Sequence, residues 1–293
     1  MPTPHRQHSR RRPGFTLVEL LVVVTIILVL AGIAVLFVPS LADKQRASEG
    51  ASQFQGWLLI AKQKALRDQG PRGIRLTPNM GKLPQYPAHY VTDLQYIEQP
   101  PDFTGGLVNQ FLPNNMVSFT GVDFYGGFGP TDPTLWPVQP GDYLEIKGGG
   151  SVSRIQAVGQ TTLTLVSTPV VVNTPTWQYR IIRQARILAG EDELQMPQNV
   201  AIDLKLSRAG SQVNVFSGQP IDILFSPSGT VIGQVAAYDK LALWVKDTTL
   251  ADTEGEPTLI AVFSRTGLLA SYPVDLNSTN PYSYLDDGRY AGP

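Results

Sequence analysis

A single carboxylate at the head of an apolar run is the residue of this sequence most in need of a chemical role. Glu19 stands five residues after Gly14 and is the only charged residue among residues 15–38. A short basic leader with four arginines precedes the run. Because a carboxylate in hydrocarbon costs about 2.5–3.5 kcal/mol on insertion scales, Glu19 requires a specific function.

This stretch resembles the prepilin-type cleavage and methylation signature of type IV pilins and type II secretion pseudopilins. The basic leader, Gly14-Phe15, the Thr-Leu-Val-Glu sequence ending at Glu19 and the apolar run occur in register. The resemblance implies that a membrane aspartic peptidase cuts between Gly14 and Phe15, and that the new Phe15 amine is N-methylated. Glycine suits this cut because it has no side chain to hinder a protease. The resemblance also implies that Glu19 neutralises the Phe15 amine of a neighbouring subunit in a filament, which pairs two charges that are each costly alone.

Two other kinds of segment compete with this interpretation. A secretory signal peptide has a shorter apolar region followed by a small-residue cleavage site, and no A-x-A sequence stands just beyond residue 38. A plain single-pass anchor also tolerates a glutamate in its first turn, where the helix dipole and the lipid headgroups favour it. The residues alone leave the plain anchor open, and the resemblance favours the prepilin.

The composition excludes several kinds of catalytic and metal site. The chain has no cysteine, so it has no disulfide, thiolate metal site or thiol nucleophile. Two of its three histidines, His5 and His8, lie in the leader, which leaves only His89 for histidine chemistry. A His-based triad and a multi-histidine metal site are therefore excluded from the mature chain. We expect no catalytic residue, no metal and no cofactor, and we interpret the chain as not an enzyme.

The charge balance gives little support for nucleic-acid binding. Removal of the four leader arginines leaves 19 Lys and Arg against 24 Asp and Glu, a mildly acidic chain. Some pilus relatives bind DNA through basic residues of the head, which makes Arg180, Arg183 and Arg186 the candidate nucleic-acid contacts. In a strand, Arg180 and Arg186 would share one face while Arg183 points to the other. We therefore do not expect nucleic acid among the partners.

Grouped carboxylates are the remaining candidates for chemistry. Such groups could bind Ca²⁺ or serve glycoside hydrolysis, which needs two carboxylates at a set separation. The groups are Asp142 with Glu145, residues 191–193, and Asp286 with Asp287. None has the ligand spacing of a calcium loop, so we interpret them as solvated turns and leave calcium binding open.

A long N-terminal helix is predicted to carry Glu19. After the leader (residues 1–14), residues 15–38 are long enough to cross a bilayer as a helix, at about 1.5 Å per residue. Pro39 is expected to loosen the helix there, because it lacks an N–H. Residues 39–69 continue it as an amphipathic half, until Gly70-Pro71 ends the pattern. Its apolar stripe predicts packing on a sheet and consists of Ala47, Ala51, Phe54, Leu58, Ala61 and Ala65.

The rest of the chain is predicted to be a β-rich head over residues 70–276, with a polar, fraying tail over residues 277–293. Short β-rich runs alternate with Gly, Pro, Asn and Asp from residue 72 onwards. Predicted strands cover residues 143–146, 162–166, 177–182, 200–206, 221–225, 241–245 and 259–263. An insertion is expected at about residues 84–185. Within it we predict mainly irregular loop over residues 84–140 and a small peripheral β-meander over residues 141–166.

Parts of the head resemble H-type minor pseudopilins and their pilus counterparts. Residues 63–76 resemble their helix-to-first-strand junction, and three later segments resemble their central and closing strands in the expected order. These segments are residues 194–204, 223–229 and 260–268. The whole resemblance covers roughly residues 15–80 and 185–275, and the segment between departs from the pattern.

The sequence therefore predicts an α+β fold, with a long N-terminal transmembrane and amphipathic helix packed on a β-rich, pilin-like head. The resemblance implies a minor-type pseudopilin or pilin, a structural subunit of a type II secretion pseudopilus or a type IV pilus. Its partners would be other pilins or pseudopilins, the prepilin peptidase/methyltransferase, the inner-membrane assembly platform and, before assembly, membrane lipid. It would cross the bacterial inner membrane once, with the leader cytoplasmic and the head periplasmic. The alternatives are an adhesive or DNA-binding pilus tip protein and, less favoured, a tethered enzyme.

Overall fold

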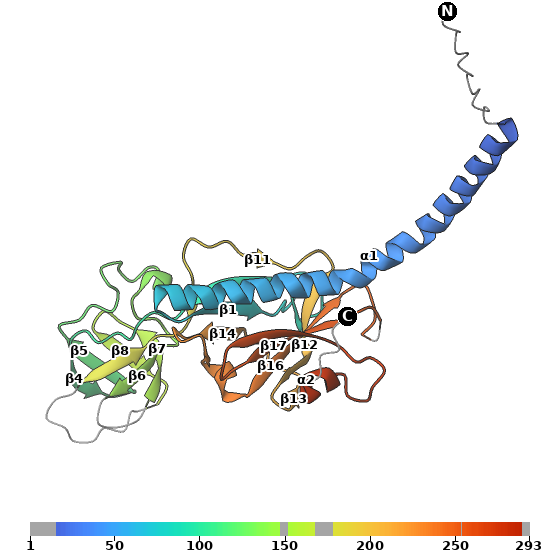
Figure 1. The fold of residues 1–293 in the computed structure, drawn as a ribbon. Coiled ribbons are helices and arrows are strands. Elements are labelled where there is room, and N and C mark those ends of the chain that lie inside the picture. Colours follow the sequence, from blue (N-terminus) through green and yellow to red (C-terminus); the bar gives the residue numbers. More distant parts are fainter. Residues whose placement is uncertain (1–15, 147–151, 168–177, 253, 289–293) are drawn as a thin grey trace, which may run out of the picture.

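A long helix packed on a β-rich head gives the molecule its shape in the computed structural model (Figure 1). The structure describes residues 16–146, 152–167, 178–252 and 254–288, and for residues 34–44 it describes only the backbone. The predicted α+β class is confirmed, because helix α1 (Leu17–Asp68) is followed mainly by strands. The other helical segments described are η1 (Pro133–Leu135), η2 (Gln234–Ala237) and α2 (Ser283–Asp287).

Helix α1 projects from the head in its first half and lies along the head in its second half (Figure 1). The backbone stays helical through Pro39, and the helix ends at Asp68, followed by the C-cap residue Gln69 in a left-handed conformation with a φ of 50°. The predicted apolar stripe is confirmed, since its six members are at most 2% exposed. Alanine makes up four of these six positions, and its small side chain lets α1 lie close to the strands.

Two antiparallel sheets form the main head beneath α1. The first has the order β10-β3-β1-β14-β15, with β11 also pairing with β3, and the second has the order β13-β12-β16-β17-β18, with β2 pairing with β12. The strands of the first sheet are β1 (Arg72–Thr77), β3 (Asp93–Glu98), β10 (Arg186–Ile187), β11 (Leu194–Gln195), β14 (Ile221–Phe225) and β15 (Val231–Ile232). Those of the second are β2 (Tyr90–Val91), β12 (Val200–Ala209), β13 (Gln212–Val213), β16 (Lys240–Asp247), β17 (Thr258–Phe263) and β18 (Leu268–Pro273).

One hydrophobic core joins α1 to both sheets. Phe54 and Leu58 of α1 meet Ile74 of the first sheet and Leu243 of the second in this core, and each is fully buried. Gly73 is the second residue of β1 and lies opposite Leu224 of β14. A Cβ atom there would lie 2.0 Å from the carbonyl oxygen of Ile223, so the pairing of β1 with β14 requires glycine.

The C-terminal segment covers the other face of the second sheet. Tyr282 and Leu285 are 5% and 3% exposed, and they pack on Trp244 and Ala242, which alternate with the residues that face α1. The Tyr282 hydroxyl also donates a hydrogen bond to the carbonyl oxygen of Leu206 at 2.6 Å. The expected fraying from residue 277 is therefore wrong as far as residue 288, because these side chains anchor the segment. Residues 289–293 lie outside the described part.

A third antiparallel sheet forms a separate lobe near the C-terminal end of α1 (Figure 1). We call residues 103–182, apart from residues 147–151 and 168–177, the lobe. Its strands have the order β4-β5-β8-β7-β6-β9. They are β4 (Leu107–Leu112), β5 (Met116–Thr120), β6 (Tyr143–Ile146), β7 (Val152–Val158), β8 (Thr162–Leu165) and β9 (Tyr179–Ile182). The lobe falls within the segment predicted as an insertion, but β2 and β3, from the same segment, pair with β12 and β1 of the main head.

The expectations for the interior of this segment need correction in one place. Residues 84–140 lie mostly outside helices and strands, as expected, and the strands that they contain are β2, β3, β4 and β5. The predicted meander is present as the pairing of β6 with β7 and of β7 with β8, but it is not peripheral. It forms the middle of the six-stranded sheet, and Leu144, Ile155 and Leu163 are buried in the core of the lobe. Removal of residues 141–166 alone would therefore destroy that core.

Two glycines of α1 give a matched test of helix–sheet spacing. A Cβ at Gly50 would lie 2.6 Å from Cγ1 of the buried Val200, whereas a Cβ at Gly56 would meet nothing within 4 Å. We expect Gly50→Ala to lower the free energy of unfolding by about 1–3 kcal/mol through overpacking. Gly56→Ala should raise it by about 1 kcal/mol through helix propensity. Urea unfolding followed by tryptophan fluorescence measures both, and equal effects at the two positions would contradict the spacing argument.

Candidate functional site

The N-terminal candidate site is described from Thr16 onwards, because Gly14 and Phe15 lie outside the described residues. The Glu19 amide donates a hydrogen bond to Oγ1 of Thr16 at 3.2 Å. In return, the amide and the hydroxyl of Thr16 each donate to Oε2 of Glu19 at 3.1 Å. This reciprocal arrangement is a capping box, which satisfies amide groups that the first turn of a helix leaves unpaired. It fixes the Glu19 carboxylate beside the backbone of residue 16.

Thr16 is the residue of this site that sequence reasoning missed. The signal was present, since a threonine three residues before a glutamate, ahead of an apolar run, is typical of a capping box. The resemblance to prepilins implies a partner for Glu19 only in a neighbouring subunit. In the single chain the carboxylate is already hydrogen-bonded, and it lies at the helix end where the dipole favours negative charge.

The first half of α1 presents a continuous apolar surface. All side chains of residues 16–33 are exposed, including Leu17 at 80% and Leu28 at 66%. An exposed apolar surface of this extent marks contact with lipid or with other proteins. Within the described ranges, no helix is long and apolar enough to cross a membrane.

The three candidate nucleic-acid arginines lie where the lobe joins the main head, on separate elements. Arg180 lies in β9, Arg186 in β10, and Arg183 between them. Arg180 donates to Oε2 of Glu145 on the neighbouring strand β6 at 2.5 Å and to Oδ2 of Asp102 at 3.2 Å. The shared strand face expected for Arg180 and Arg186 is therefore not formed.

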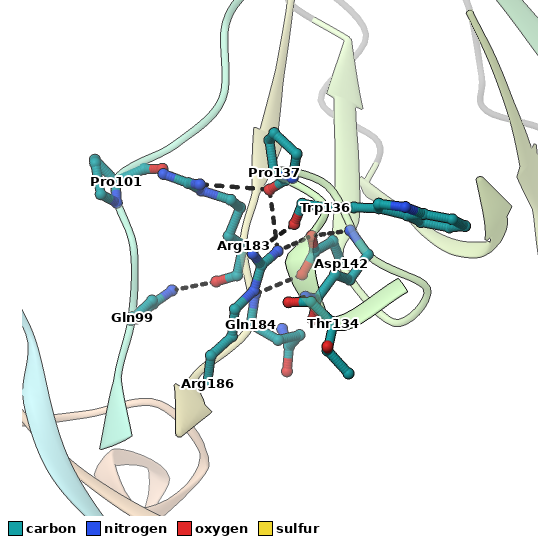
Figure 2. A network of polar contacts seen from close by, with 10 residues as sticks. Gln99, Pro101, Thr134, Trp136, Pro137, Asp142, Arg183, Gln184 and Arg186 are labelled. Carbon is teal, nitrogen blue, oxygen red and sulfur yellow. Dashed lines mark hydrogen bonds and ion pairs between the residues drawn. The ribbon is translucent and has the colours of Figure 1, made fainter. Parts of the chain in front are cut away.

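Arg183 and Arg186 point into a network of backbone carbonyls and one carboxylate (Figure 2). Nε of Arg183 donates to the carbonyl oxygen of Pro101 at 2.6 Å. Nη1 of Arg186 donates to the carbonyl oxygen of Trp136 at 2.9 Å, and Nη2 donates to Oδ2 of Asp142 at 3.0 Å. These guanidinium groups thus bind acceptors from other segments of the same chain. The arrangement therefore gives no support to a phosphate-binding face.

Burial determines the electrostatics of this junction. Asp142 is 1% exposed, and burial raises the pKa of its carboxyl group, against the opposing effect of the amides of Gln184 and Gln139 and of the Arg186 charge. Burial, together with the nearby Arg186 charge, lowers the pKa of Arg183. The ion pair of Asp142 with Arg186 is therefore a buried contact rather than a solvated turn.

The carboxylate groups proposed from the sequence do not converge on a common point. Glu145 pairs with Arg180, whereas Asp142 pairs with Arg186. Glu191 pairs with Lys64, and Glu193 lies 3.4 Å from Nζ of Lys82. Among the residues that the structure describes, no cluster of three His, Cys, Asp or Glu side chains could hold a metal ion.

Asp286 fastens the C-terminal segment to the second sheet. Its carboxylate accepts hydrogen bonds from both terminal nitrogens of Arg208, from Nζ of Lys240 at 3.0 Å and from Nδ2 of Asn280 at 3.2 Å. The Arg208 hydrogen bonds are the largest cause that holds the pKa of Asp286 far below its usual range. Of the two carboxylates predicted here as a solvated turn, Asp286 is ion-paired with Arg208 and Lys240, and both Asp286 and Asp287 are exposed.

We expect Asp286→Asn to lower the free energy of unfolding by about 1 kcal/mol at neutral pH, because charge-assisted hydrogen bonds are lost at a carboxylate that water partly screens. Since the folded-state pKa is lowered, this contribution is present above the unfolded pKa of about 3.9 and is lost as the pH falls through the folded-state value. The difference from wild type should therefore shrink below about pH 4 in urea unfolding. Asp287→Asn is the matched control, and it should leave stability unchanged. A difference for Asp286→Asn that stays constant with pH would contradict the assignment.

His89, the histidine left for chemistry, lies in a packed environment. Its Nε2 atom is 3.8 Å from Oδ1 of the buried Asp203, which accepts hydrogen bonds from the amides of Lys205 and Leu206. Its ring packs edge-on against Tyr90, with ring centroids 4.8 Å apart. Burial lowers the pKa of His89 and raises that of Asp203. These contacts are those of a histidine that stabilises the fold.

Comparison with known families places the N-terminal site in context. Residues 9–35 match the prokaryotic N-terminal methylation motif, which is the signature of type IV pilins and pseudopilins. No curated protein sequence matches the chain significantly. The motif supports a pilin-type or pseudopilin-type precursor and points to a structural subunit rather than an enzyme. It implies processing by prepilin peptidase, anchoring to a membrane and assembly with other pilins.

Proposed function

We propose that this chain is a prepilin that matures into a minor-type subunit of a type II secretion pseudopilus or a type IV pilus. The observation that carries the proposal is the methylation motif at residues 9–35, which covers the last part of the basic leader, Gly14, Phe15 and Glu19. The capping box of Thr16 and Glu19 supports it, because a defined helix start lies directly after the proposed cleavage site. The subunit is structural and acts through assembly.

Processing separates the leader from the helix. Prepilin peptidase cuts the Gly14–Phe15 bond, and the Phe15 amine is then N-methylated. Residues 15–38 anchor the precursor in the inner membrane as a single span of roughly 36 Å, which exceeds a hydrocarbon core of about 30 Å. The leader arginines stay cytoplasmic by the positive-inside rule, which places the head in the periplasm.

Assembly uses the two halves of α1 differently. The second half is covered on one face by the sheets, through residues such as Phe54 and Leu58. The first half is exposed throughout residues 16–33, so it is the part that exchanges lipid for the helices of other pilins or pseudopilins. The likeness of residues 194–204 and 223–229 to H-type minor pseudopilins supports a minor-type subunit that the inner-membrane assembly platform incorporates.

The alternative of a DNA-binding tip protein has less support. Arg180, Arg183 and Arg186 each donate hydrogen bonds to groups of the same chain, and the mature chain is mildly acidic. An adhesive role would rest on the lobe, for which no ligand chemistry is evident in the described residues.

Intact mass spectrometry of protein purified from membranes with active peptidase tests the proposal. The expected mass is that of residues 15–293 plus one methyl group. Recovery of the full chain from Met1, or of a chain cut beyond residue 38, would overturn it. Cross-linking of the mature protein to pilins in sheared or membrane fractions then tests assembly.

A further inference from the structure

The lobe and the main head have separate hydrophobic cores. The core of the lobe includes Phe119, Phe124 and Leu144, and the core beneath α1 includes none of these residues. The six described strands of the lobe pair only with one another. Two domains that share no core are expected to move relative to one another unless something else fixes them.

The lobe is attached through two chain segments that run side by side. The amide of Phe103 donates to the carbonyl oxygen of Ile181 at 2.9 Å, and the amide of Ile181 donates back at 2.8 Å. Closer to the main head, Nε2 of Gln99 donates to the carbonyl oxygen of Arg183 at 2.9 Å (Figure 2). A two-stranded connection of this kind fixes the distance between the domains but leaves their angle free to vary.

An ion pair across the connection supplies the missing constraint. Arg186 belongs to the main head, because its strand β10 pairs with β3 opposite Glu98. Its guanidinium reaches into the lobe and donates to the carbonyl oxygens of Trp136 and Pro137 and to the Asp142 carboxylate, at 2.9–3.0 Å (Figure 2). One side chain of the main head thus binds three acceptors of the lobe.

Asp142 is bound from several directions at once. Its Oδ2 accepts from the Gln139 amide of the lobe at 2.9 Å, and its Oδ1 accepts from the Gln184 amide of the connecting segment at 2.8 Å. Together with Arg186, these donors come from the lobe, the connection and the main head. The carboxylate can therefore accept all of these hydrogen bonds only when the lobe, the connecting segment and the main head are in the orientation seen in the structure.

We propose that the Asp142–Arg186 pair is a latch that holds a separately folded lobe in one orientation on the main head. A buried ion pair adds little net stability compared with apolar packing, but its geometric demands can specify one arrangement. Nε of Arg186 is buried without a hydrogen-bond partner in the described structure, which is a cost that further lowers the net stability contributed by the pair. Without the latch, the two-stranded connection acts as a hinge and both cores stay folded.

Because the chain has no cysteine, two spin labels can be placed without background. Cysteines at the exposed positions Gln53 on α1 and Gln160 in the lobe report the distance between the domains by pulsed electron paramagnetic resonance. The full chain in detergent micelles should give one narrow distance distribution. Asp142→Asn should replace it with a broad one, because either amide orientation points an NH₂ group at a hydrogen-bond donor.

Two further variants separate the latch from general damage to the fold. Glu145→Gln removes a nearby carboxylate on β6, but its partner Arg180 lies on β9 of the same lobe, so the distribution should stay narrow. Arg186→Lys keeps the charge but loses the forked contact to the carbonyl oxygens, so it should broaden the distribution as Asp142→Asn does. Near-ultraviolet circular dichroism must show that the aromatic cores persist. A narrow, wild-type distribution in Asp142→Asn and Arg186→Lys, or loss of the aromatic signal together with the broadening, would overturn the proposal.

Discussion

Gly14→Val should leave the chain in the membrane as uncut precursor, with its basic leader still attached. A protease must bring its catalytic groups against the backbone at the bond that it cuts, and a branched side chain next to that bond obstructs the approach. Because residue 14 precedes the helix and the head, the substitution should not affect folding. The expected result is near-complete loss of the mature species, detected as an intact mass that begins at Met1.

Gly32→Val is the matched control for this experiment. It introduces the same side chain into the same N-terminal segment, at a position where an added Cβ meets nothing within 4 Å. This variant should be cut like wild type, which shows that added bulk in the apolar run is tolerated. A mature mass recovered from Gly14→Val would mean that the cut lies elsewhere, and the proposed processing site would then fail.

Regular periodicity made the long helix and several strands predictable. The stripe from Ala47 to Ala65 follows helical spacing, and all six of its members are buried as expected. Strands β6 and β14 have the bounds predicted from their β-rich composition and flanking turns. In each case the information lies within one short stretch of sequence, so no knowledge of distant residues is needed.

The errors and the missed strands arose where tertiary contacts decide the structure. Residues 84–140 are rich in Pro, Gly and aromatic residues, so β4 and β5 carry a weak local signal and depend on pairing with each other and with β8. The C-terminal segment reads as polar, yet Tyr282 and Leu285 dock on the second sheet. Local composition could not reveal these partners.

The difference between local sequence signals and tertiary contacts also applies to the functional residues. Thr16 and Glu19 are three residues apart, so their capping box could be found from sequence pattern alone. Asp142 and Arg186 are 44 residues apart and meet only because the lobe folds back on the main head. A solvated turn was the expectation for Asp142, and its burial follows from that return of the chain.

Glu19→Ala should abolish most incorporation into filaments while leaving membrane insertion and cleavage largely intact. In the single chain, the carboxylate is exposed and shares the capping box with Thr16. In the proposed filament core the carboxylate loses its contact with water, and we propose that its partner there is the Phe15 amine of a neighbouring subunit. Removal of one partner of a buried ion pair costs about 3–5 kcal/mol, which corresponds to a more than hundredfold loss of assembly.

Glu19→Ala removes both the charge and the capping box, so a second variant must separate the two. Glu19→Gln keeps the capping box, because glutamine at this position still accepts the Thr16 amide hydrogen bond, but it carries no charge. If charge pairing drives assembly, Glu19→Gln should be lost from filaments as fully as Glu19→Ala. If the helix start alone matters, Glu19→Gln should assemble like wild type, and Thr16→Val should fail as Glu19→Ala does. Cross-linking to other pilins in sheared and membrane fractions measures incorporation. Normal assembly of Glu19→Ala would show that the glutamate serves only as a headgroup anchor, and the filament proposal would lose its main physical support.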